Sequence, residues 1–188
     1  PVSKNAFKMP KALTIFDPFC GTGVIPLEAM LRGWHVLGSD KEEKAVRGCA
    51  KNIEWARKTY KILKKDVDSE TWKQDATKPF ELEKTPPSVI VTAGTLGPAM
   101  RSRPMLKDIE RHAKTSEALL EKFLSNCAAT LPGVPVAMTW PVWYSHKRPV
   151  FLSKGREICQ KLGYTLVLPP HTNAGSRGTL LYRRQEQF

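Results

Sequence analysis

Apolar segments of two kinds alternate along the chain. Short runs rich in β-branched and aromatic residues lie at residues 12–19, 34–39, 70–74, 88–92, 134–139, 164–168 and 179–183. Longer segments, at residues 24–32, 42–60, 107–130 and 151–162, repeat their apolar residues with helical spacing. The short runs are typical of strands, and the longer segments are typical of amphipathic helices. The alternation predicts an α/β fold.

The connections between these segments predict how the strands are arranged. A strand, a helix and a strand within residues 12–39 require a right-handed crossover, so the first two strands should be parallel neighbours. The last two strands are joined by residues 169–178 without a helix, so they should be antiparallel neighbours. We predict one doubly wound domain over residues 12–188, with a mostly parallel sheet and a reversed hairpin at one edge. Residues 1–11 are polar and basic, and we expect a tail or linker there.

The charge balance adds information about a partner. The 188 residues include 30 Lys and Arg against 18 Asp and Glu, which gives a net charge of +12. Such a balance favours a polyanionic partner such as nucleic acid, and a basic surface without that role is the alternative. The helix at residues 42–60 carries several of these cations on its outer face. We interpret it as a solvated face, with nucleic-acid contact as the alternative.

The four cysteines occur without a C-x-x-C pair. Because the chain has neither a metal-ligand spacing nor a dense disulfide pattern, we expect reduced thiols in a cytoplasmic protein and no metal. Residues 134–144 form the most apolar run, but two prolines interrupt it and it is too short to cross a bilayer. We therefore expect no membrane partner.

A turn with two glycines follows the first strand. It reads Asp17-Pro18-Phe19-Cys20-Gly21-Thr22-Gly23 and leads directly into the first helix. In α/β sheets such a turn presents a nucleotide-like cofactor at the carboxyl end of a strand, and glycine lets the backbone turn sharply against the ligand. The spacing differs from the phosphate loop of nucleoside triphosphatases. The third glycine of the dinucleotide fingerprint is absent, which disfavours a nicotinamide-dependent oxidoreductase. An ordinary strand-to-helix turn is the alternative.

The motif D-P-F-C-G-T-G, followed by V-I-P-L-E-A, resembles the first motif of class I S-adenosylmethionine-dependent methyltransferases. It is most similar to the tRNA guanosine-N2 methyltransferases, which often carry a THUMP RNA-binding domain. The resemblance implies a Rossmann-like methyltransferase fold: a seven-stranded, mostly parallel sheet with one antiparallel edge strand and helices on both faces. It also implies S-adenosylmethionine as the cofactor and tRNA or another nucleic acid as the partner. Because the chain begins at Pro1, we expect that an N-terminal RNA-binding domain can be missing from it.

Several residues are candidates for binding the cofactor. Asp40 ends the second strand, close to the roughly 20-residue spacing at which an acidic residue meets ribose hydroxyls, and an N-cap role for the next helix is the alternative. The resemblance implies that Asp40 and Lys41 hold the ribose and that Asp75 and Ala76 contact the adenine, where a surface turn is the alternative. It further implies that residues of the glycine turn shape the pocket, namely Asp17, Phe19, Gly21 and Gly23.

The loop after the fourth strand departs from the resembled family. Residues 93–98 read A-G-T-L-G-P, where that family usually has D-P-P-Y, N-P-P-F or E-P-Y-L-G-P. In those motifs an acidic or amide side chain and a carbonyl accept the N–H bonds of the target amine, and an aromatic ring stacks on the flipped base. Here Ala93 replaces the acidic residue and Thr95 the aromatic one. We assign the catalytic role to Thr92, Gly94 and Thr95, because the carbonyls of residues 92–94 can still accept hydrogen bonds.

Two basic segments are candidate RNA contacts. Arg101 and Arg103 begin a run of cations after the catalytic loop, where Arg can grip phosphates bidentately, and a solvated loop is the alternative. Trp143, Lys147 and Arg148 follow the fifth strand and combine a ring for stacking with cations for phosphates. Anchoring of that loop on the core by tryptophans is the alternative. Trp143 and Tyr144 are also the candidates to replace the missing aromatic residue of the catalytic loop.

The sequence therefore predicts an S-adenosylmethionine-dependent methyltransferase that acts on an exocyclic base amine of RNA, with N2 of guanosine in tRNA as the leading candidate. Two alternatives stay open. One is a catalytically weakened relative that binds S-adenosylmethionine or RNA, since the acidic and aromatic residues of the loop are replaced. The other is a DNA amino-methyltransferase, which shares the fold and the motif order.

Overall fold

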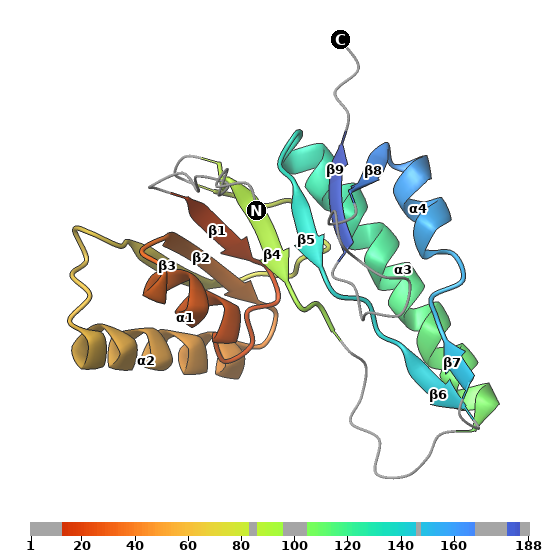
Figure 1. Cartoon of the computed structure of the whole chain (residues 1–188), viewed down its shortest axis with the longest axis horizontal. Helices are drawn as coiled ribbons and strands as arrows, with labels where there is room; N and C mark the ends of the chain where they lie inside the picture. Colours follow the sequence, from red (N-terminus) through yellow and green to blue (C-terminus); the bar gives the residue numbers. More distant parts are fainter. Residues whose placement is uncertain (1–12, 83–85, 96–104, 146–147, 168–179, 185–188) are drawn as a thin grey trace, which may run out of the picture.

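A computed structural model describes residues 13–82, 86–95, 105–145, 148–167 and 180–184 (Figure 1). Strands and helices alternate through most of this part of the chain, as the hydrophobic pattern predicts. In chain order the elements are β1 (Thr14–Asp17), α1 (Val24–Leu31), β2 (His35–Asp40), α2 (Glu43–Tyr60), β3 (Ser69–Lys73), β4 (Val89–Thr92), α3 (Leu106–Thr130), β5 (Val136–Met138), β6 (Trp143–Ser145), β7 (Arg148–Val150), α4 (Gly155–Lys161), β8 (Tyr164–Val167) and β9 (Leu180–Arg184).

The main sheet has the strand order β3-β2-β1-β4-β5-β9-β8. The first five strands in this order run parallel to one another, so the mostly parallel Rossmann-like sheet is confirmed. The predicted hairpin is also present, because β8 and β9 pair in antiparallel fashion. The position of the reversed strand was wrong: β9 lies between β5 and β8, and β8 forms the edge. A separate antiparallel pair, β6 with β7, was not predicted.

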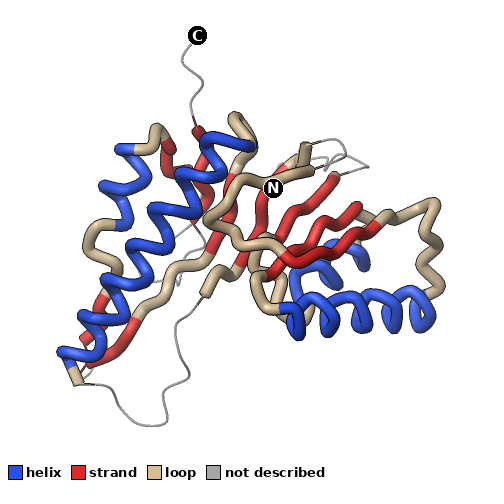
Figure 2. The backbone as a smooth tube through the Cα atoms, turned by 180° about the vertical axis from the view of Figure 1, so that it is seen from behind, coloured by secondary structure: helices blue, strands red, loops and turns tan. Residues whose placement is uncertain are grey.

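Consecutive residues of β1 face two different cores. Ile15 packs with Met30 of α1 and Cys49 of α2 on one face of the sheet. Phe16 packs on the other face, in a larger cluster that includes Phe123 of α3. Side chains alternate between the faces of a strand, so a strand that is covered on both sides carries apolar residues without interruption. The helix pairs α1–α2 and α3–α4 accordingly lie apart, with the strands between them (Figure 2).

The helix predicted from residue 151 begins four residues later, at Gly155. The preceding segment is held by a buried carboxylate of α3, because Glu117 Oε1 accepts hydrogen bonds from Ser153 Oγ at 3.0 Å and from Lys154 N at 2.7 Å. Gly155 itself lies against Trp140, since a Cβ there would stand 2.5 Å from Trp140 Cζ3. Contacts with distant parts of the chain therefore determine where α4 starts.

A membrane-spanning helix must be long and apolar. Among the helices of the described residues, not one combines the length and the hydropathy that a bilayer requires.

Candidate functional site

The predicted cofactor residues gather where the parallel strands end. In the register of the sheet, Asp17 at the end of β1 lies beside Gly38 of β2, and Asp40 at the end of β2 lies beside Lys73 of β3. The carboxyl ends of parallel strands meet at one edge of a sheet, which is where α/β folds bind ligands. The backbone N–H of Gln74 donates to the carbonyl of Asp40 at 3.0 Å, which ties the exit of β3 to the end of β2.

The two glycines of the turn have different surroundings. Gly21 has a φ of +52°, and a Cβ there would meet no atom within 4 Å, so its outer side is open. Gly23 has a φ of +96°, and a Cβ there would stand 2.8 Å from Cys49 Sγ on α2. Both conformations favour glycine. The open side of Gly21 leaves room for a ligand against the backbone, whereas Gly23 permits close packing between the start of α1 and α2.

Asp40 connects the glycine turn to α2. Its Oδ2 accepts a hydrogen bond from Gly21 N at 3.0 Å, and its Oδ1 accepts one from Glu42 N at 2.9 Å. Glu42 and not Asp40 occupies the N-cap position of α2. An ionised carboxylate has about four lone-pair sites, so Asp40 can accept from a ribose while it keeps both backbone bonds. This half-buried carboxylate and the open side of Gly21 fit the adenosine portion of the predicted cofactor. Lys41, the next residue in the chain, is exposed.

Asp17 is an internal residue of the site. Only 2% of it is exposed, and it accepts hydrogen bonds from Phe19 N at 3.1 Å and from the Thr92 hydroxyl. Burial raises the pKa of Asp17 to about 6, because a charged carboxylate is poorly solvated there. Through these two hydrogen bonds, Asp17 connects the glycine turn to the end of β4, and in this way it can shape the pocket.

Asp75 and Ala76 follow β3 at the same edge of the sheet. Asp75 is exposed, and its Oδ1 accepts from Thr77 N at 2.9 Å and from Thr77 Oγ1 at 2.8 Å, which lowers the pKa of Asp75. Ala76 is buried, and its carbonyl accepts from Asn126 Nδ2 at 2.9 Å. Asn126 also donates to Lys78 O. It was missed by sequence reasoning, although an amide among the apolar residues of the long helix was a visible signal.

Two of the backbone carbonyls predicted to accept hydrogen bonds from the target amine already accept them from another residue of the chain. The carbonyl of Thr92 accepts from Thr139 N at 3.3 Å, and the carbonyl of Ala93 accepts from Thr139 Oγ1 at 2.8 Å. The Thr92 hydroxyl accepts from Gly94 N at 3.0 Å. Thr92 is buried, so it supports the loop from below. Of the three predicted catalytic residues, Gly94 and Thr95 are the two that line a pocket.

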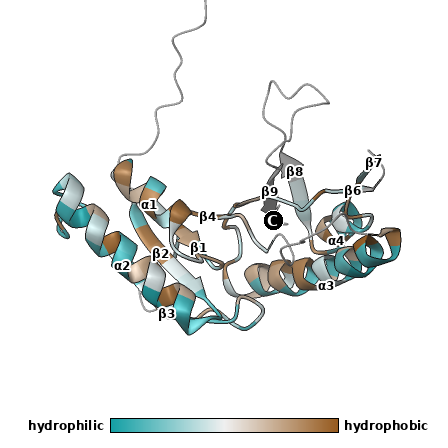
Figure 3. Ribbon diagram, turned by 90° about the horizontal axis from the view of Figure 1, so that it is seen from below, coloured by the Kyte–Doolittle hydropathy of each residue, from teal (hydrophilic) through white to brown (hydrophobic). Residues whose placement is uncertain are grey.

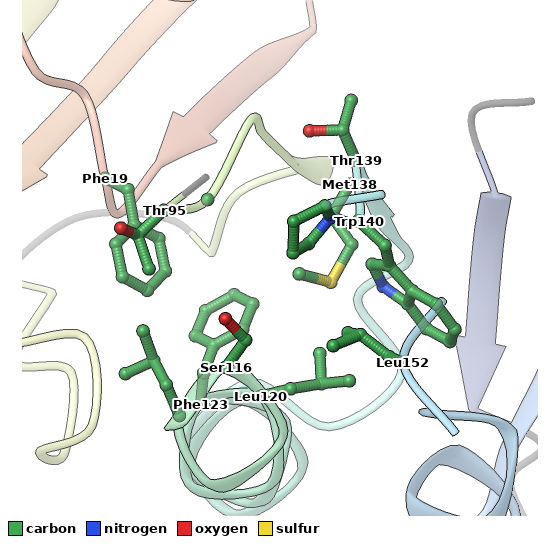
Figure 4. A pocket seen from close by; sticks show the side chains of 12 residues that line it. Phe19, Thr95, Ser116, Leu120, Phe123, Met138, Thr139, Trp140 and Leu152 are labelled. Carbon is green, nitrogen blue, oxygen red and sulfur yellow. The ribbon is translucent and has the colours of Figure 1, made fainter. Parts of the chain in front are cut away.

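This pocket lies between the glycine turn, the ends of β4 and β5, and α3 (Figure 4). It opens to solvent, and its empty space is about 350 Å³ with the open solvent at its mouth included. Phe19 of the glycine turn borders it. The rings of Phe19 and Phe123 pack edge-to-face, with their centroids 5.2 Å apart. Other lining residues are mostly apolar, with hydroxyl groups among them: Ser116, Leu119, Leu120, Met138, Thr139, Trp140, Pro141 and Leu152. Figure 4 shows the Ser116 hydroxyl pointing from α3 toward the pocket.

The predicted RNA contacts receive little support from the described residues. Trp143 is only 7% exposed and belongs to the core beneath α3, so its ring is not free to stack on a base, and the core-anchor alternative is correct. Arg148 lies in β7, but its side chain falls outside the described residues, as do Arg101, Arg103 and Lys147. Their contacts with RNA stay predictions.

Comparison with known sequences identifies the family. Residues 8–114, more than half of the chain, match the family described as RMKL-like, methyltransferase domain. The chain belongs to this family. It is therefore an S-adenosylmethionine-dependent methyltransferase domain, in agreement with the predicted cofactor. A curated relative, a probable tRNA (guanine(10)-N2)-dimethyltransferase of Methanothermococcus thermolithotrophicus, is 29% identical over 76 residues, which are 40% of this chain and 44% of that protein. The chain thus spans less than half of this relative's length.

Solved structures show the same fold at low sequence identity. An S-adenosylmethionine-dependent methyltransferase from Methanosarcina mazei superposes with a TM-score of 0.60 at 12% identity, over 95% of both chains. Magnesium protoporphyrin IX methyltransferase from Synechocystis, with S-adenosylmethionine bound, has a TM-score of 0.56 at 16% identity, over 95% of this chain and 73% of that one. Both comparisons support the Rossmann-like methyltransferase fold.

Proposed function

We propose that this domain transfers a methyl group from S-adenosylmethionine to an exocyclic amine of a base in RNA, with N2 of guanosine in tRNA as the target. The observation that carries this proposal is the shared pocket. Phe19 from the cofactor turn and Gly94 and Thr95 from the end of β4 border the same space. An acceptor held there lies between the cofactor edge and the loop that holds the target amine in the resembled family.

The cofactor supplies an electrophilic methyl group on its sulfonium sulfur. In this proposal Asp40 accepts hydrogen bonds from the ribose, with Lys41 beside it, and the open side of Gly21 receives the adjoining part of the cofactor. Asp75 and Ala76 border the adenine, and Gly23 and Asp17 keep the turn in place. The pairing of Asp40 with Gly21 and the bond from Gln74 to Asp40 hold these parts of the site at one edge.

The pocket has the chemistry of a site for a flat, neutral ring. The side chains of Phe19, Phe123 and Met138 offer apolar surfaces, and the hydroxyls of Thr95 and Ser116 offer hydrogen bonds at its border. An amine conjugated to its ring is a poor nucleophile, so its lone pair must be aligned for direct displacement at the methyl carbon. Phe19 is suited to the stacking role that Trp143, as a core residue, does not fill.

The charge of the chain and its relative support RNA as the substrate. The net charge of +12 favours association with a polyanion. The curated relative named above is, by its name, a probable tRNA guanine N2 methyltransferase, and it matches over part of the chain. Together they favour tRNA over a small-molecule acceptor.

A transfer assay with isotopically labelled S-adenosylmethionine tests the proposal. We expect label in a tRNA transcript that contains guanosine and none in a transcript in which inosine, which lacks the N2 amine, replaces it. Nucleoside mass spectrometry should then find N2-methylguanosine. Label in duplex DNA but not in tRNA would instead identify a DNA amino-methyltransferase.

A second candidate function is a domain that binds S-adenosylmethionine and RNA but transfers methyl groups slowly. It is favoured by the exposed Ala93, which lacks a carboxylate, and by the engagement of the Ala93 carbonyl with Thr139. Binding of S-adenosylhomocysteine by calorimetry without transfer to bulk tRNA would support it. In that case Ala93→Asp, which restores an acceptor side chain, should raise the transfer rate, whereas the control Ala93→Leu should not.

A further inference from the structure

The far end of α2 carries an exposed surface that the cofactor site does not explain. Trp55, Tyr60 and Leu63 are 55%, 53% and 53% exposed, respectively. The rings of Trp55 and Tyr60 meet edge-to-face with their centroids 5.9 Å apart. Five exposed lysines belong to the same part of the chain. We call this set the Trp55 surface: Lys51, Trp55, Lys58, Tyr60, Lys61, Leu63, Lys64 and Lys65.

Trp55 faces away from the core. The buried residues of α2 are Val46, Cys49, Ile53 and Ala56, which form one stripe along the helix. At about 100° per residue, Trp55 stands on the opposite side of the helix from this stripe. Lys51 and Lys58, four residues before it and three after it, are its neighbours on that side. Packing within the domain therefore does not account for a tryptophan at this position.

The cations of the Trp55 surface outnumber the acidic groups near them. Glu54 pairs with Lys58 at 3.2 Å, and Asp66 is the other acidic residue within residues 51–66. Arg57 has a structural role, because its side chain donates hydrogen bonds to Val67 O and Ser69 Oγ, each at 2.7 Å. Positive charge is therefore in excess around two exposed rings. Hydrophilic residues predominate along this part of the helix (Figure 3).

We propose that the Trp55 surface is a second nucleic-acid contact, which stacks unpaired bases of an RNA on Trp55 and Tyr60 and holds the neighbouring phosphates with its lysines. Exposed rings beside cations are the combination that single-stranded nucleic acid requires, because every base has a face for stacking and every linkage carries a negative charge. A partner without negative charge would use the apolar rings but would leave this excess of positive charge uncompensated.

The Trp55 surface lies away from the proposed transfer site. α2 begins after Asp40, at the carboxyl edge of the sheet, and runs to the opposite edge (Figure 1). Trp55 stands about 18 Å along this helix from Glu43, at 1.5 Å per residue. An RNA that contacts both places must be extended or large. The surface is therefore an anchor that acts at a distance from the reacting base, and it is independent of whether methyl transfer takes place.

Binding of two matched probes to the full chain tests the stacking half of the proposal. One probe is a fluorescein-labelled oligouridylate, and the other is an abasic oligonucleotide of equal length, which keeps the phosphates and lacks the bases. We expect Trp55→Ala and Tyr60→Ala each to weaken binding of the oligouridylate about five- to 100-fold, and to leave the abasic probe almost unchanged. Trp55→Phe, which keeps a ring, should retain most of the affinity. Leu31→Ala, on α1, is the control for removal of an exposed apolar side chain.

Salt dependence tests the electrostatic half. The triple variant with Lys61, Lys64 and Lys65 changed to Gln should weaken binding of both probes. It should also reduce the slope of log affinity against log salt by about 0.7 for each phosphate that is no longer neutralised, measured between about 50 and about 200 mM salt. Lys122→Gln, at an exposed position of α3, is the control and should leave the slope unchanged. All variants should keep the melting temperature and the affinity for S-adenosylhomocysteine.

Two results would overturn the proposal. One is unchanged oligouridylate binding in Trp55→Ala and Tyr60→Ala. The other is a concentration-dependent dimer of the wild type that Trp55→Ala abolishes in sedimentation experiments, which would make the surface an interface between copies of the chain. The proposed function fails separately: absence of methyl transfer to RNA, with binding still sensitive to Trp55, would reject the enzyme and keep the anchor.

Discussion

Gly21 N donates a hydrogen bond to Asp40 Oδ2 at 3.0 Å and thereby joins the glycine turn after β1 to the end of β2. The same carboxylate accepts from Glu42 N through its other oxygen, so its orientation is determined by the backbone on two sides. Preorganisation of this kind lowers the cost of ordering a ligand contact. We therefore expect that the proposed ribose contact does not require the Asp40 side chain to reorient.

Replacement of Asp40 should weaken cofactor binding. Asp40→Ala removes an acceptor with charge-assisted bonds, so we expect the affinity for S-adenosylhomocysteine to fall about 10- to 100-fold, which corresponds to about 1.5–3 kcal/mol. Asp40→Asn keeps one carbonyl oxygen and should lose less. Isothermal titration calorimetry measures both, and Asp66→Ala, at an exposed position, is the control. Wild-type affinity in Asp40→Ala would contradict the ribose assignment.

The two glycines of the turn should respond to alanine differently, because a new Cβ would clash at Gly23 and would meet open space at Gly21. Gly23→Ala combines a left-handed φ with a Cβ 2.8 Å from Cys49 Sγ, so we expect a decrease of about 2–5 kcal/mol in the free energy of unfolding. Gly21→Ala has the backbone strain without the clash and should lose about 1–2 kcal/mol, while its Cβ enters the open side and weakens binding of S-adenosylhomocysteine. Urea denaturation and calorimetry give the two readouts.

A double mutant checks the cause of the Gly23 effect. Cys49→Ala removes the sulfur that the new Cβ would meet. The destabilisation in Gly23→Ala plus Cys49→Ala should therefore be smaller than the sum of the two single effects. Additive effects would show that contact with the Cys49 sulfur is not the reason for glycine at this position.

Asp17 should make the stability of the domain depend on pH in a defined window. The carboxyl group of an aspartate in an unfolded chain has a pKa of about 3.9, whereas burial raises the pKa of Asp17 to about 6. Between these values the unfolded chain loses the proton while the folded chain keeps it. The contribution of Asp17 is therefore fully present below about pH 4 and falls by about 3 kcal/mol as the pH rises through 6.

The variant Asp17→Asn does not titrate and isolates this contribution. Its free energy of unfolding relative to the wild type should rise between about pH 4 and about pH 6.5 and then become constant. Denaturation at a series of pH values measures the difference, in which the titration of other groups cancels. Parallel curves for the two proteins would show that Asp17 does not hold its proton in the folded state.

Asn126 should act on the cofactor site through the backbone. Asn126→Ala leaves the carbonyls of Ala76 and Lys78 without their donor, so we expect a decrease of about 1–3 kcal/mol in the free energy of unfolding. If the loop at residues 75–78 borders the adenine, the affinity for S-adenosylhomocysteine should fall as well. Ser125→Ala, at the neighbouring exposed position, is the control. Reduced stability with unchanged affinity would limit Asn126 to a structural role.

The order of the elements and the place of the site could be predicted from the sequence. The predicted bounds of α1, α2 and α3 agree with the structure within one residue at each end. Their apolar spacing is a local property, and it follows directly from the helical repeat. The position of Asp40 beside the glycine turn also followed, because a strand–helix–strand unit brings the carboxyl ends of its two strands together.

Other features depended on contacts between distant residues. Trp143 and Trp55 are both tryptophans near cations, yet the first is buried under α3 and the second is exposed on α2. Each has a tyrosine and cations close by in the sequence, so those neighbours do not distinguish the two, and the packing of β6 against α3 is what buries Trp143. The insertion of β9 between β5 and β8 likewise depends on which strand edge is available once the sheet has formed.

The glycine motif shows most clearly which features depend on local sequence and which depend on distant contacts. Its sequence by itself determined that the backbone turns sharply after β1 and enters a helix, because only glycine adopts these φ values at low cost. Only the tertiary structure decided which surroundings each glycine has, and therefore which role it plays. Gly23 faces Cys49, which lies on another helix, and Gly21 faces open space beside Asp40. The reason is physical: a turn conformation is encoded by neighbouring residues, whereas the atoms that surround it come from elsewhere in the chain.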